Sequence, residues 1–381
     1  SSSTSLQDID QQEVVMFYVD DQNMLATIGS STLLIFIYDL STQRFRELQS
    51  LSSASGSQWR GATHVVIAST HYLVAAVWKS YTADSNSVLF RYTSSSGKFA
   101  QQSTFSTPSQ ARAFTHFAVT SSHHYLLASD YSIPGDANSL FKWNPSTTTF
   151  EKGNGFNAGG RTQSLEHFVA TGNHYVIAAV TLIGASNYIA DSTLFRFDVS
   201  NEVLTSIQTV GPQDAATKWT HFNIADQDYL VVANNGAGVH TGRWNPTSRI
   251  YLFDPATEKL KLPAHQEIQL KENLGWEYFN VGSEHFLIAA QYRINSNRDL
   301  SQSSPLYRFD AATQLFVLFA NVPTASGAAS WDSLFFAGRH FLALSDYQKG
   351  NALTMFELES VDFSSSRTIN INSKANTKIE T

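Results

Sequence analysis

One hydrophobic phrase recurs along the chain at intervals of roughly 50 residues, a spacing that suits a four-stranded propeller blade. Each copy has a turn residue, usually histidine, followed in most copies by an aromatic residue and an apolar run rich in alanine, as in residues 174–179. Apolar runs of this length predict buried strands. The copies begin at Asn23, His71, His124, His174, Asp228, His285 and His340 and fill the chain from end to end.

Other strand-like phrases keep the same period. An aromatic-rich run with a basic residue in several copies follows each alanine-rich strand, and a polar turn and a weaker strand come next. A further apolar strand lies just before each alanine-rich one. Each repeat therefore predicts a four-stranded antiparallel meander, and the predicted fold is all-β, a single seven-bladed β-propeller in which most sheet edges are hidden.

The repeats also set the predicted boundaries. The propeller is expected to span residues 14–363, with a polar segment at 1–13 and a polar tail at 364–381. The N-terminal segment is interpreted as a mature terminus left after removal of a leader. How the ring closes stays open, because either terminus can add an edge strand. The predicted blades are residues 14–50, 62–100, 114–151, 165–206, 219–262, 276–318 and 331–363.

Composition and motifs narrow the function classes. With a formal net charge of −7 and no basic cluster, the chain is not expected to bind nucleic acid. No apolar stretch approaches the roughly 18 residues of a membrane-spanning helix, so no membrane insertion is expected. The sequence contains no cysteine, which excludes disulfides and thiolate metal sites. It also lacks nucleophile-elbow, metal-binding and phosphate-loop motifs, and the chain is predicted not to be an enzyme.

The sixth repeat carries a family resemblance. Residues 276–290, followed by 305–309, resemble the EAR repeat, also called EPTP, of the leucine-rich glioma-inactivated secreted proteins and some adhesion-type receptors. The resemblance extends over residues 14–363. It implies a propeller that is secreted and recognises a cell-surface protein or glycan, and, for some members, a cation in the central channel. The chain departs from the family in its first repeat, which lacks the aromatic residue, and in having no leucine-rich domain.

Loop lengths predict which face of the ring binds a ligand. The first-to-second and third-to-fourth turns are short, whereas the second-to-third and fourth-to-first connections are long, polar and expected on one rim. Aromatic residues in the second-to-third loops can stack on a sugar ring or anchor a protein contact. The alternative is that they fold back onto neighbouring loops. The predicted ligand-binding residues are Trp78, Tyr81, Tyr131, Tyr188, Trp244, Tyr292 and Tyr347.

The first strands supply candidate groups for a channel site. Four histidines at corresponding positions are interpreted as structural, because they show no fixed metal-ligand spacing; they are His64, His116, His167 and His221. Carboxylates on or beside these strands offer the oxygen ligands that Ca²⁺ prefers, although their positions differ between repeats. The candidate metal-binding residues are Asp20, Glu166, Glu277 and Asp332.

Three functions are compatible with these features. The leading hypothesis is a secreted recognition module that binds a cell-surface protein or, as a lectin does, a glycan through the long-loop face. A propeller hydrolase or lyase acting on a polysaccharide would need two carboxylates about 5 to 10 Å apart on that face. A structural or adhesive matrix protein would fit the Ser- and Thr-rich loops, and it would self-associate.

Overall fold

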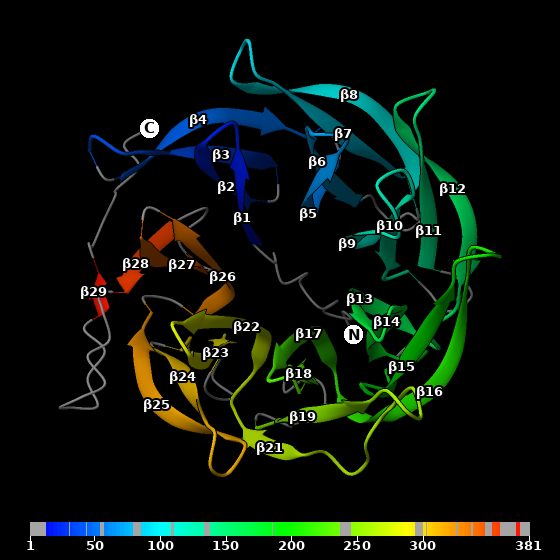
Figure 1. The fold of residues 1–381 in the computed structure, drawn as a ribbon, viewed down its shortest axis with the longest axis vertical. Coiled ribbons are helices and arrows are strands. Elements are labelled where there is room, and N and C mark those ends of the chain that lie inside the picture. Colours follow the sequence, from blue (N-terminus) through cyan, green and yellow to red (C-terminus); the bar gives the residue numbers. More distant parts are fainter. Residues whose placement is uncertain are drawn as a thin grey trace, which may run out of the picture.

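A computed structural model shows seven antiparallel sheets arranged around a central axis, which confirms the predicted seven-bladed propeller (Figure 1). It describes residues 13–373 except 30, 43, 54–56, 79–84, 108–109, 133–137, 185, 237–244, 294–299, 302, 325–326, 337, 347–352 and 359–370. Among these residues no helix is long and apolar enough to cross a membrane.

The strands follow one another as meanders, so that each sheet contains consecutive strands from its inner to its outer edge. We call the strands of a blade A to D from the axis outward. Blade 1 is β1 (Val14–Val19), β2 (Gln22–Ile28), β3 (Thr32–Asp39) and β4 (Arg44–Ser52); blade 2 is β5 (Gln58–Ile67), β6 (Thr70–Trp78), β7 (Ser85–Thr93) and β8 (Lys98–Thr107); blade 3 is β9 (Ala111–Ala118), β10 (His124–Asp130), β11 (Asn138–Asn144) and β12 (Thr149–Phe156); blade 4 is β13 (Arg161–Ala170), β14 (Asn173–Leu182), β15 (Ile189–Asp198) and β16 (Val203–Asp214).

The remaining three blades complete the ring, and blade 5 differs in that two short segments both pair with its third strand. Blade 5 is β17 (Ala216–Ile224), β18 (Gln227–Asn234), β19 (Thr247–Asp254), β20 (Lys259–Leu260) and β21 (Gln266–Gln269); blade 6 is β22 (Asn273–Val281), β23 (Glu284–Gln291), β24 (Ser303–Asp310) and β25 (Leu315–Pro323); blade 7 is β26 (Ala328–Phe336), β27 (Arg339–Asp346), β28 (Leu353–Leu358) and β29 (Ile371–Ser373).

The alanine-rich strands form the buried B position of each blade. β10 is buried along its whole length, because both of its faces pack against other blades. Burial on both faces explains why these strands read as continuous apolar runs rather than as alternating patterns. The hydrophobic core therefore lies between blades, as where Ile35 of blade 1 packs with Leu73 and Phe90 of blade 2.

The outer D strands are mostly exposed and bury only a few anchor residues, and neighbouring D strands are linked by side-chain hydrogen bonds. In β8 the ring of Phe99 is buried while the adjacent residues are exposed. The side-chain amide of Gln208 in β16 donates to the carbonyl oxygen of Leu260 (2.9 Å) and accepts from its N–H (2.7 Å). Gln49 makes the same paired contact with Phe99, and Gln266 makes it with Phe316.

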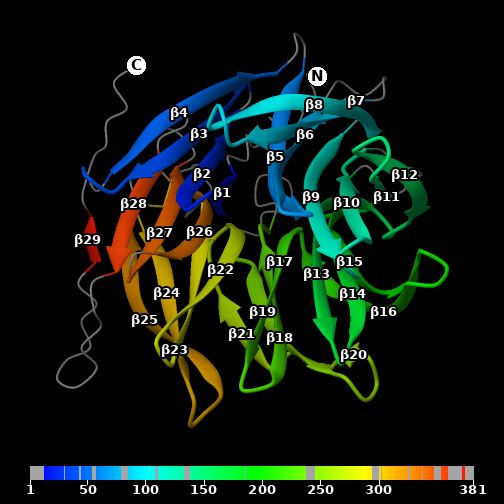
Figure 2. The ribbon, with the colours of Figure 1, turned by 45° about the horizontal axis from the view of Figure 1, so that its top comes forward.

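The ring closes between a blade made wholly of N-terminal strands and a blade made wholly of C-terminal strands, β1 lying beside β26 (Figure 2). The N–H of Val14 donates to Ser330 Oγ (3.0 Å), and the N–H of Met16 donates to Asp332 Oδ2 (2.6 Å). The Tyr38 ring packs edge-on against Phe336 at 4.7 Å. Side-chain contacts therefore close the ring, and no blade mixes strands from the two termini.

Two details of the predicted organisation differ from the structure. The fourth strand of blade 7 is β29, which lies beyond the predicted boundary at residue 363, in the segment expected to be a tail. The fourth-to-first connections are short, as at residue 215 between β16 and β17, because the D and A strands extend toward each other. The elaborated rim is therefore built mainly from the B–C loops.

Candidate functional site

Two of the predicted ligand-binding aromatics, Trp78 and Tyr131, lie half-buried on the rim formed by the B–C loops. Trp78 ends β6, and Tyr131 directly follows β10. The backbone N–H of Tyr131 donates to the carbonyl oxygen of Gln110 (3.2 Å), which ties this loop to the adjoining A strand. Both rings are thus held at the ends of rigid strands.

Arginine side chains from the A strands stack on these two rings. The guanidinium carbon of Arg112 lies 4.3 Å from the centre of the Tyr131 ring, and that of Arg161, from the next blade, lies 5.6 Å away. Arg60 lies 5.0 Å from the Trp78 ring. Such cation–π contacts stabilise both partners and fix their orientation. We call Arg60, Trp78, Arg112, Tyr131 and Arg161 the loop rim; no sequence pattern indicated a role for its arginines.

The other predicted aromatics are buried or lie outside the described residues. Tyr292 is fully buried in the core of blade 6, and its hydroxyl accepts from Arg293 (2.9 Å). Tyr188 is 7% exposed and packs against Leu182 and Ala215. These two rings fold back into the protein and offer no stacking surface, which was the alternative considered for the loop aromatics. Tyr81, Trp244 and Tyr347 lie outside the described residues.

Three of the four metal-site candidates meet near the axis, but they surround a lysine. Lys218 of β17 interacts electrostatically with Glu166, Glu277 and Asp332, and also with Glu13, which directly precedes β1. We call these five residues the axial cluster. Asp20 lies elsewhere, exposed in the turn between β1 and β2.

Hydrogen bonds hold the carboxylates of the axial cluster. Asp332 accepts the N–H of Met16 (2.6 Å), and Glu166 accepts the N–H of His221 (3.1 Å). Glu277 accepts the hydroxyl of Ser333 (2.7 Å). Each bond joins one blade to the next, so the cluster ties the inner strands together.

Burial raises the pKa values of the carboxyl groups in the axial cluster, and the surrounding carboxylates raise the pKa of its lysine. Burial raises the pKa of Glu166 to about 7 despite the hydrogen bond from His221 and the charge of Lys218, and burial also raises the pKa of Glu13. Burial, followed by the charge of Asp332, raises the pKa of Glu277. Burial also raises the pKa of Asp332, despite hydrogen bonds from the N–H groups of Met16 and Ser333 and the charge of Lys218. Burial opposes the charge of Lys218, but the surrounding carboxylates outweigh it and raise its pKa.

This donor set does not fit a calcium site well. The ammonium group of Lys218 interacts with all four carboxylates of the cluster, and among the described residues no group of three His, Asp or Glu side chains could hold a metal ion. A calcium site needs six or more oxygen ligands at about 2.4 Å. A cation in the channel, which the resemblance implies for some family members, stays a prediction for this chain. In the axial cluster Lys218 supplies positive charge beside the carboxylates.

The first-strand histidines pair within blades. Ring nitrogens of His64 and His71 lie 3.1 Å apart, and those of His167 and His174 lie 3.0 Å apart. His221 contacts Asp228 at 2.9 Å instead. Burial, followed by the neighbouring histidines, lowers the pKa values of His64 and His167 to about 3. At neutral pH His64 and His167 are therefore uncharged, and each is linked to its neighbour by a hydrogen bond.

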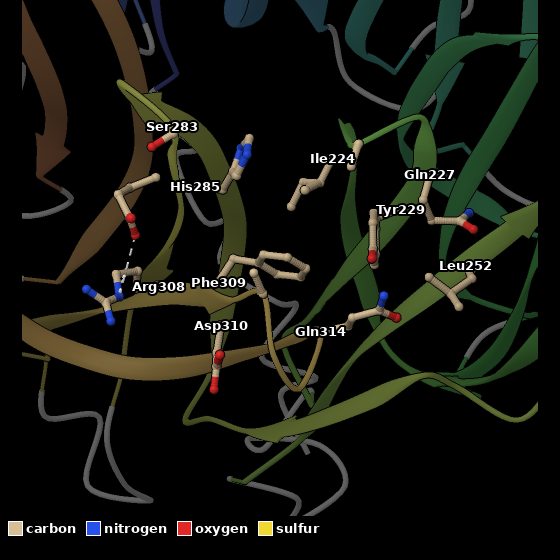
Figure 3. Close-up of a pocket in the computed structure, with 13 residues that line it drawn as sticks. Ile224, Gln227, Tyr229, Leu252, Ser283, His285, Arg308, Phe309, Asp310 and Gln314 are labelled. Atoms are coloured by element: carbon tan, nitrogen blue, oxygen red, sulfur yellow. Dashed lines mark ion pairs between the residues drawn. The ribbon is translucent and has the colours of Figure 1, made fainter.

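The opposite face, which carries the A–B and C–D turns and which we call the turn face, contains a cavity of about 490 Å³ between blades 5 and 6 (Figure 3). Tyr229 and Leu252 form its blade 5 wall, and His285, Phe309 and Gln314 form part of its blade 6 wall. Arg308 and Glu284 pair at its edge, 3.7 Å apart. Recognition was predicted on the other face, and no sequence pattern indicated this cavity.

The fold and the rim define the class first: a single seven-bladed propeller with half-buried aromatic rings on one face, held in place by stacked arginine side chains. The EPTP domain matches residues 264–310. A thrombospondin-type laminin G domain and EAR repeat-containing protein of Mus musculus is 30% identical over 168 residues, which are 44% of this chain and 23% of that protein. The protein of the same name from Homo sapiens is 29% identical over 170 residues, 45% of this chain and 24% of that protein. The chain therefore contains an EPTP match and is similar to EAR repeat-containing proteins, and the matched region spans less than a quarter of either relative.

Solved propellers share the fold at low sequence identity. A putative 6-phosphogluconolactonase from Bacteroides fragilis superposes with a TM-score of 0.62 at 13% identity, over 92% of this chain and 94% of that one. The periplasmic gluconolactonase of Pseudomonas aeruginosa gives 0.59 at 15% identity, over 82% and 85%. At these identities the likeness shows the architecture alone, because one fold hosts many unrelated functions.

Proposed function

We propose that this propeller is an extracellular recognition module that binds a cell-surface protein through its loop rim. The EPTP match and the similarity to EAR repeat-containing proteins support a protein-binding propeller. The laminin G domain in the names of the two relatives supports an extracellular location. The observation that carries the proposal is the stacking of Arg112 and Arg161 on Tyr131, beside Arg60 on Trp78.

The chemistry of the loop rim suits a protein partner. Trp, Tyr and Arg are the residues most enriched among those that dominate binding energy at protein interfaces. Rings and guanidinium groups that are already stacked lose little conformational freedom on binding, so more of the contact energy appears as affinity. The partner would pack against the half-buried rings of Trp78 and Tyr131 and place a carboxylate against the partly buried Arg161, because guanidinium groups bind carboxylates. Arg60 and Arg112 are buried and orient the rings.

The test is binding of the labelled chain to intact cells that it stains, compared with two variants. Tyr131→Leu removes the central ring and Arg161→Gln removes one stacked cation; each is expected to weaken binding at least tenfold. The matched control is Tyr18→Leu, an exposed tyrosine at the end of β1 on the turn face. Equal binding by all four proteins would refute a role for the loop rim.

A glycan ligand is the second candidate. The cavity on the turn face favours it, because aromatic side chains there lie beside amide and carboxylate groups. This combination contacts the C–H faces of sugars and hydrogen-bonds their hydroxyls. A glycan array probed with the purified chain, with and without chelator, tests it: a blank array would direct the search to protein partners alone.

A further inference from the structure

An ion pair fills the turn-face groove at two of the blade junctions. Each B-strand tyrosine on this face has a cross-strand neighbour on strand C, which is Lys142 in blade 3 and Arg196 in blade 4. Between blades 3 and 4, Lys142 bonds to Glu202 at 2.5 Å. Between blades 4 and 5, Arg196 bonds to Glu258 at 3.2 Å. Both glutamates occupy the last position of a C–D turn, where the backbone φ is positive.

The junction between blades 5 and 6 lacks both members of this pair. The strand C position opposite Tyr229 is Leu252, and the last position of the next C–D turn, again with positive φ, is Gln314. In blade 3 the corresponding tyrosine, Tyr125, donates its hydroxyl to Glu202 (2.9 Å). No glutamate is present at position 314 to accept from Tyr229. The cavity of about 490 Å³ lies at this junction.

A second junction also lacks the ion pair and also contains a cavity. Between blades 1 and 2 the strand C position is Ile37 and the turn position is Gly97, so neither member of the ion pair is present there either. A cavity of about 310 Å³ lies at that junction, lined by His71, Tyr92 and other residues. Loss of the pair therefore coincides with an open groove at two separate places in the ring.

The lining of the larger cavity is mixed and close to neutral. Ile224, Leu252 and Phe309 supply apolar surface, and Figure 3 shows Phe309 and Gln314 pointing from blade 6 toward the wall that carries Tyr229. The charges of Glu284 and Arg308 offset each other, and burial lowers the pKa of His285, which favours its neutral form. Asp310 is the remaining carboxylate, and one of its oxygens already accepts the N–H of Ala312 (3.0 Å).

We propose that this groove between blades 5 and 6 binds a neutral saccharide unit, at a site separate from the loop rim. Phe309 and Leu252 contact the C–H surface of the sugar, while Gln314, Asp310 and the hydroxyl of Tyr229 hydrogen-bond its hydroxyl groups. The volume falls within the range of about 300 to 1,000 Å³ that is usual for small-ligand pockets. A purely apolar protein side chain would leave the amide and carboxylate groups without partners, which costs free energy.

The test rebuilds the missing ion pair. The double variant Leu252→Arg with Gln314→Glu copies Arg196 and Glu258 of the neighbouring junction, so it is expected to fold and to fill the groove. Saturation-transfer NMR with a panel of neutral mono- and disaccharides (glucose, galactose, mannose, N-acetylglucosamine, lactose and maltose) measures binding. We expect at least one sugar to bind the natural chain, and the double variant to bind it at least tenfold more weakly with an unchanged melting temperature.

Two further variants make the outcome specific. Arg196→Leu with Glu258→Gln opens the junction between blades 4 and 5 and is expected to keep the original site. Tyr131→Leu on the loop rim is expected to bind the sugar normally, so failure of the saccharide site and failure of the proposed function are distinguishable. No binding by any sugar of the panel, binding that survives the rebuilt ion pair, or preference for anionic sugars would overturn the proposal.

Discussion

Replacing Gln208 by leucine is expected to destabilise the propeller through the contact between its outer strands. The side-chain amide of Gln208 bonds both the N–H and the carbonyl oxygen of Leu260 in the next blade, at 2.7 and 2.9 Å. Leucine has a similar size but can make neither bond. It therefore leaves two backbone groups of Leu260 without these partners while the packing is largely kept.

The size of the effect follows from the number of bonds. A hydrogen bond contributes about 1 kcal/mol on average, with a larger cost where a partly buried group is left unpaired, so losing both costs about 2 to 3 kcal/mol. Unfolding entropy near 2.1 cal/mol/K per residue, taken over the chain, converts this into a fall in melting temperature of about 3 °C. Differential scanning calorimetry measures it.

The matched control is Gln101→Leu, at an exposed position in the D strand of blade 2. The control is expected to melt within about 0.5 kcal/mol of the natural chain, as surface substitutions usually do. If Gln208→Leu melts at the same temperature as the control, the paired amide contact contributes nothing and the account of how the blades are cross-linked is wrong.

The charged clusters give three further predictions. His167→Tyr copies the contact of Tyr278 with His285 (2.6 Å) and should make the stability of the fold less sensitive to acid. Because the pKa of the natural His167 is lowered to about 3, the unfolded chain binds more protons, and stability is lost as pH falls from 6.5 toward 3. Urea unfolding at several pH values measures this loss. Glu277→Gln should stabilise the fold most at alkaline pH. Because the pKa of Glu277 is raised, the folded state binds more protons than the unfolded state, and stability falls as pH rises above 4.5. Parallel curves of stability against pH for the natural chain and the variant would contradict this prediction. Lys218→Met removes the internal cation and should lower the melting temperature by several degrees, with partial recovery in millimolar CaCl₂ that the natural chain does not show.

The sequence predicted the fold well because the informative strands are buried on both sides. Strand B packs between two neighbouring blades, so β10 and its equivalents are apolar without interruption and repeat visibly. The last strand was placed wrongly because β29 is only three residues long and carries one apolar residue, Ile371, whereas Phe363 resembled the fourth-strand anchors of the other repeats. A short edge strand is held by backbone pairing with its neighbour, here β28, and leaves little hydrophobic pattern in the sequence.

The candidate sites were predicted only in part, because they depend on contacts between blades. Glu166, Glu277 and Asp332 were found as carboxylates near the axis, but Lys218 was not, although alignment of the first strands gives a signal. Lys218 stands three positions before the histidine position of strand A, where the other blades carry small residues or Glu13. One of these small residues, Gly275, lies so close to the Lys218 side chain that a Cβ on it would approach the Lys218 Cδ to 3.4 Å. The small residues are Gly61, Ala113, Ser164, Gly275 and Ser330.

The loop aromatics show a second limit. Tyr292 follows an alanine-rich strand and Trp78 ends one, yet one ring is fully buried and the other half-buried. The rings differ in their neighbours: Tyr292 packs in the core cluster that contains Leu274, whereas Trp78 stacks against Arg60 on the rim. Such loop geometry is set by tertiary contacts and leaves little trace in the local sequence.

The central claim, that this chain recognises an extracellular partner through its propeller surface, is tested most directly by equilibrium binding of the purified chain to a panel of displayed cell-surface ectodomains. The account predicts saturable binding to at least one ectodomain, weakened by Tyr131→Leu and unchanged by Tyr18→Leu. Absence of saturable binding across the panel, together with turnover of a lactone or polysaccharide substrate by the same preparation, would contradict it and identify the propeller as an enzyme.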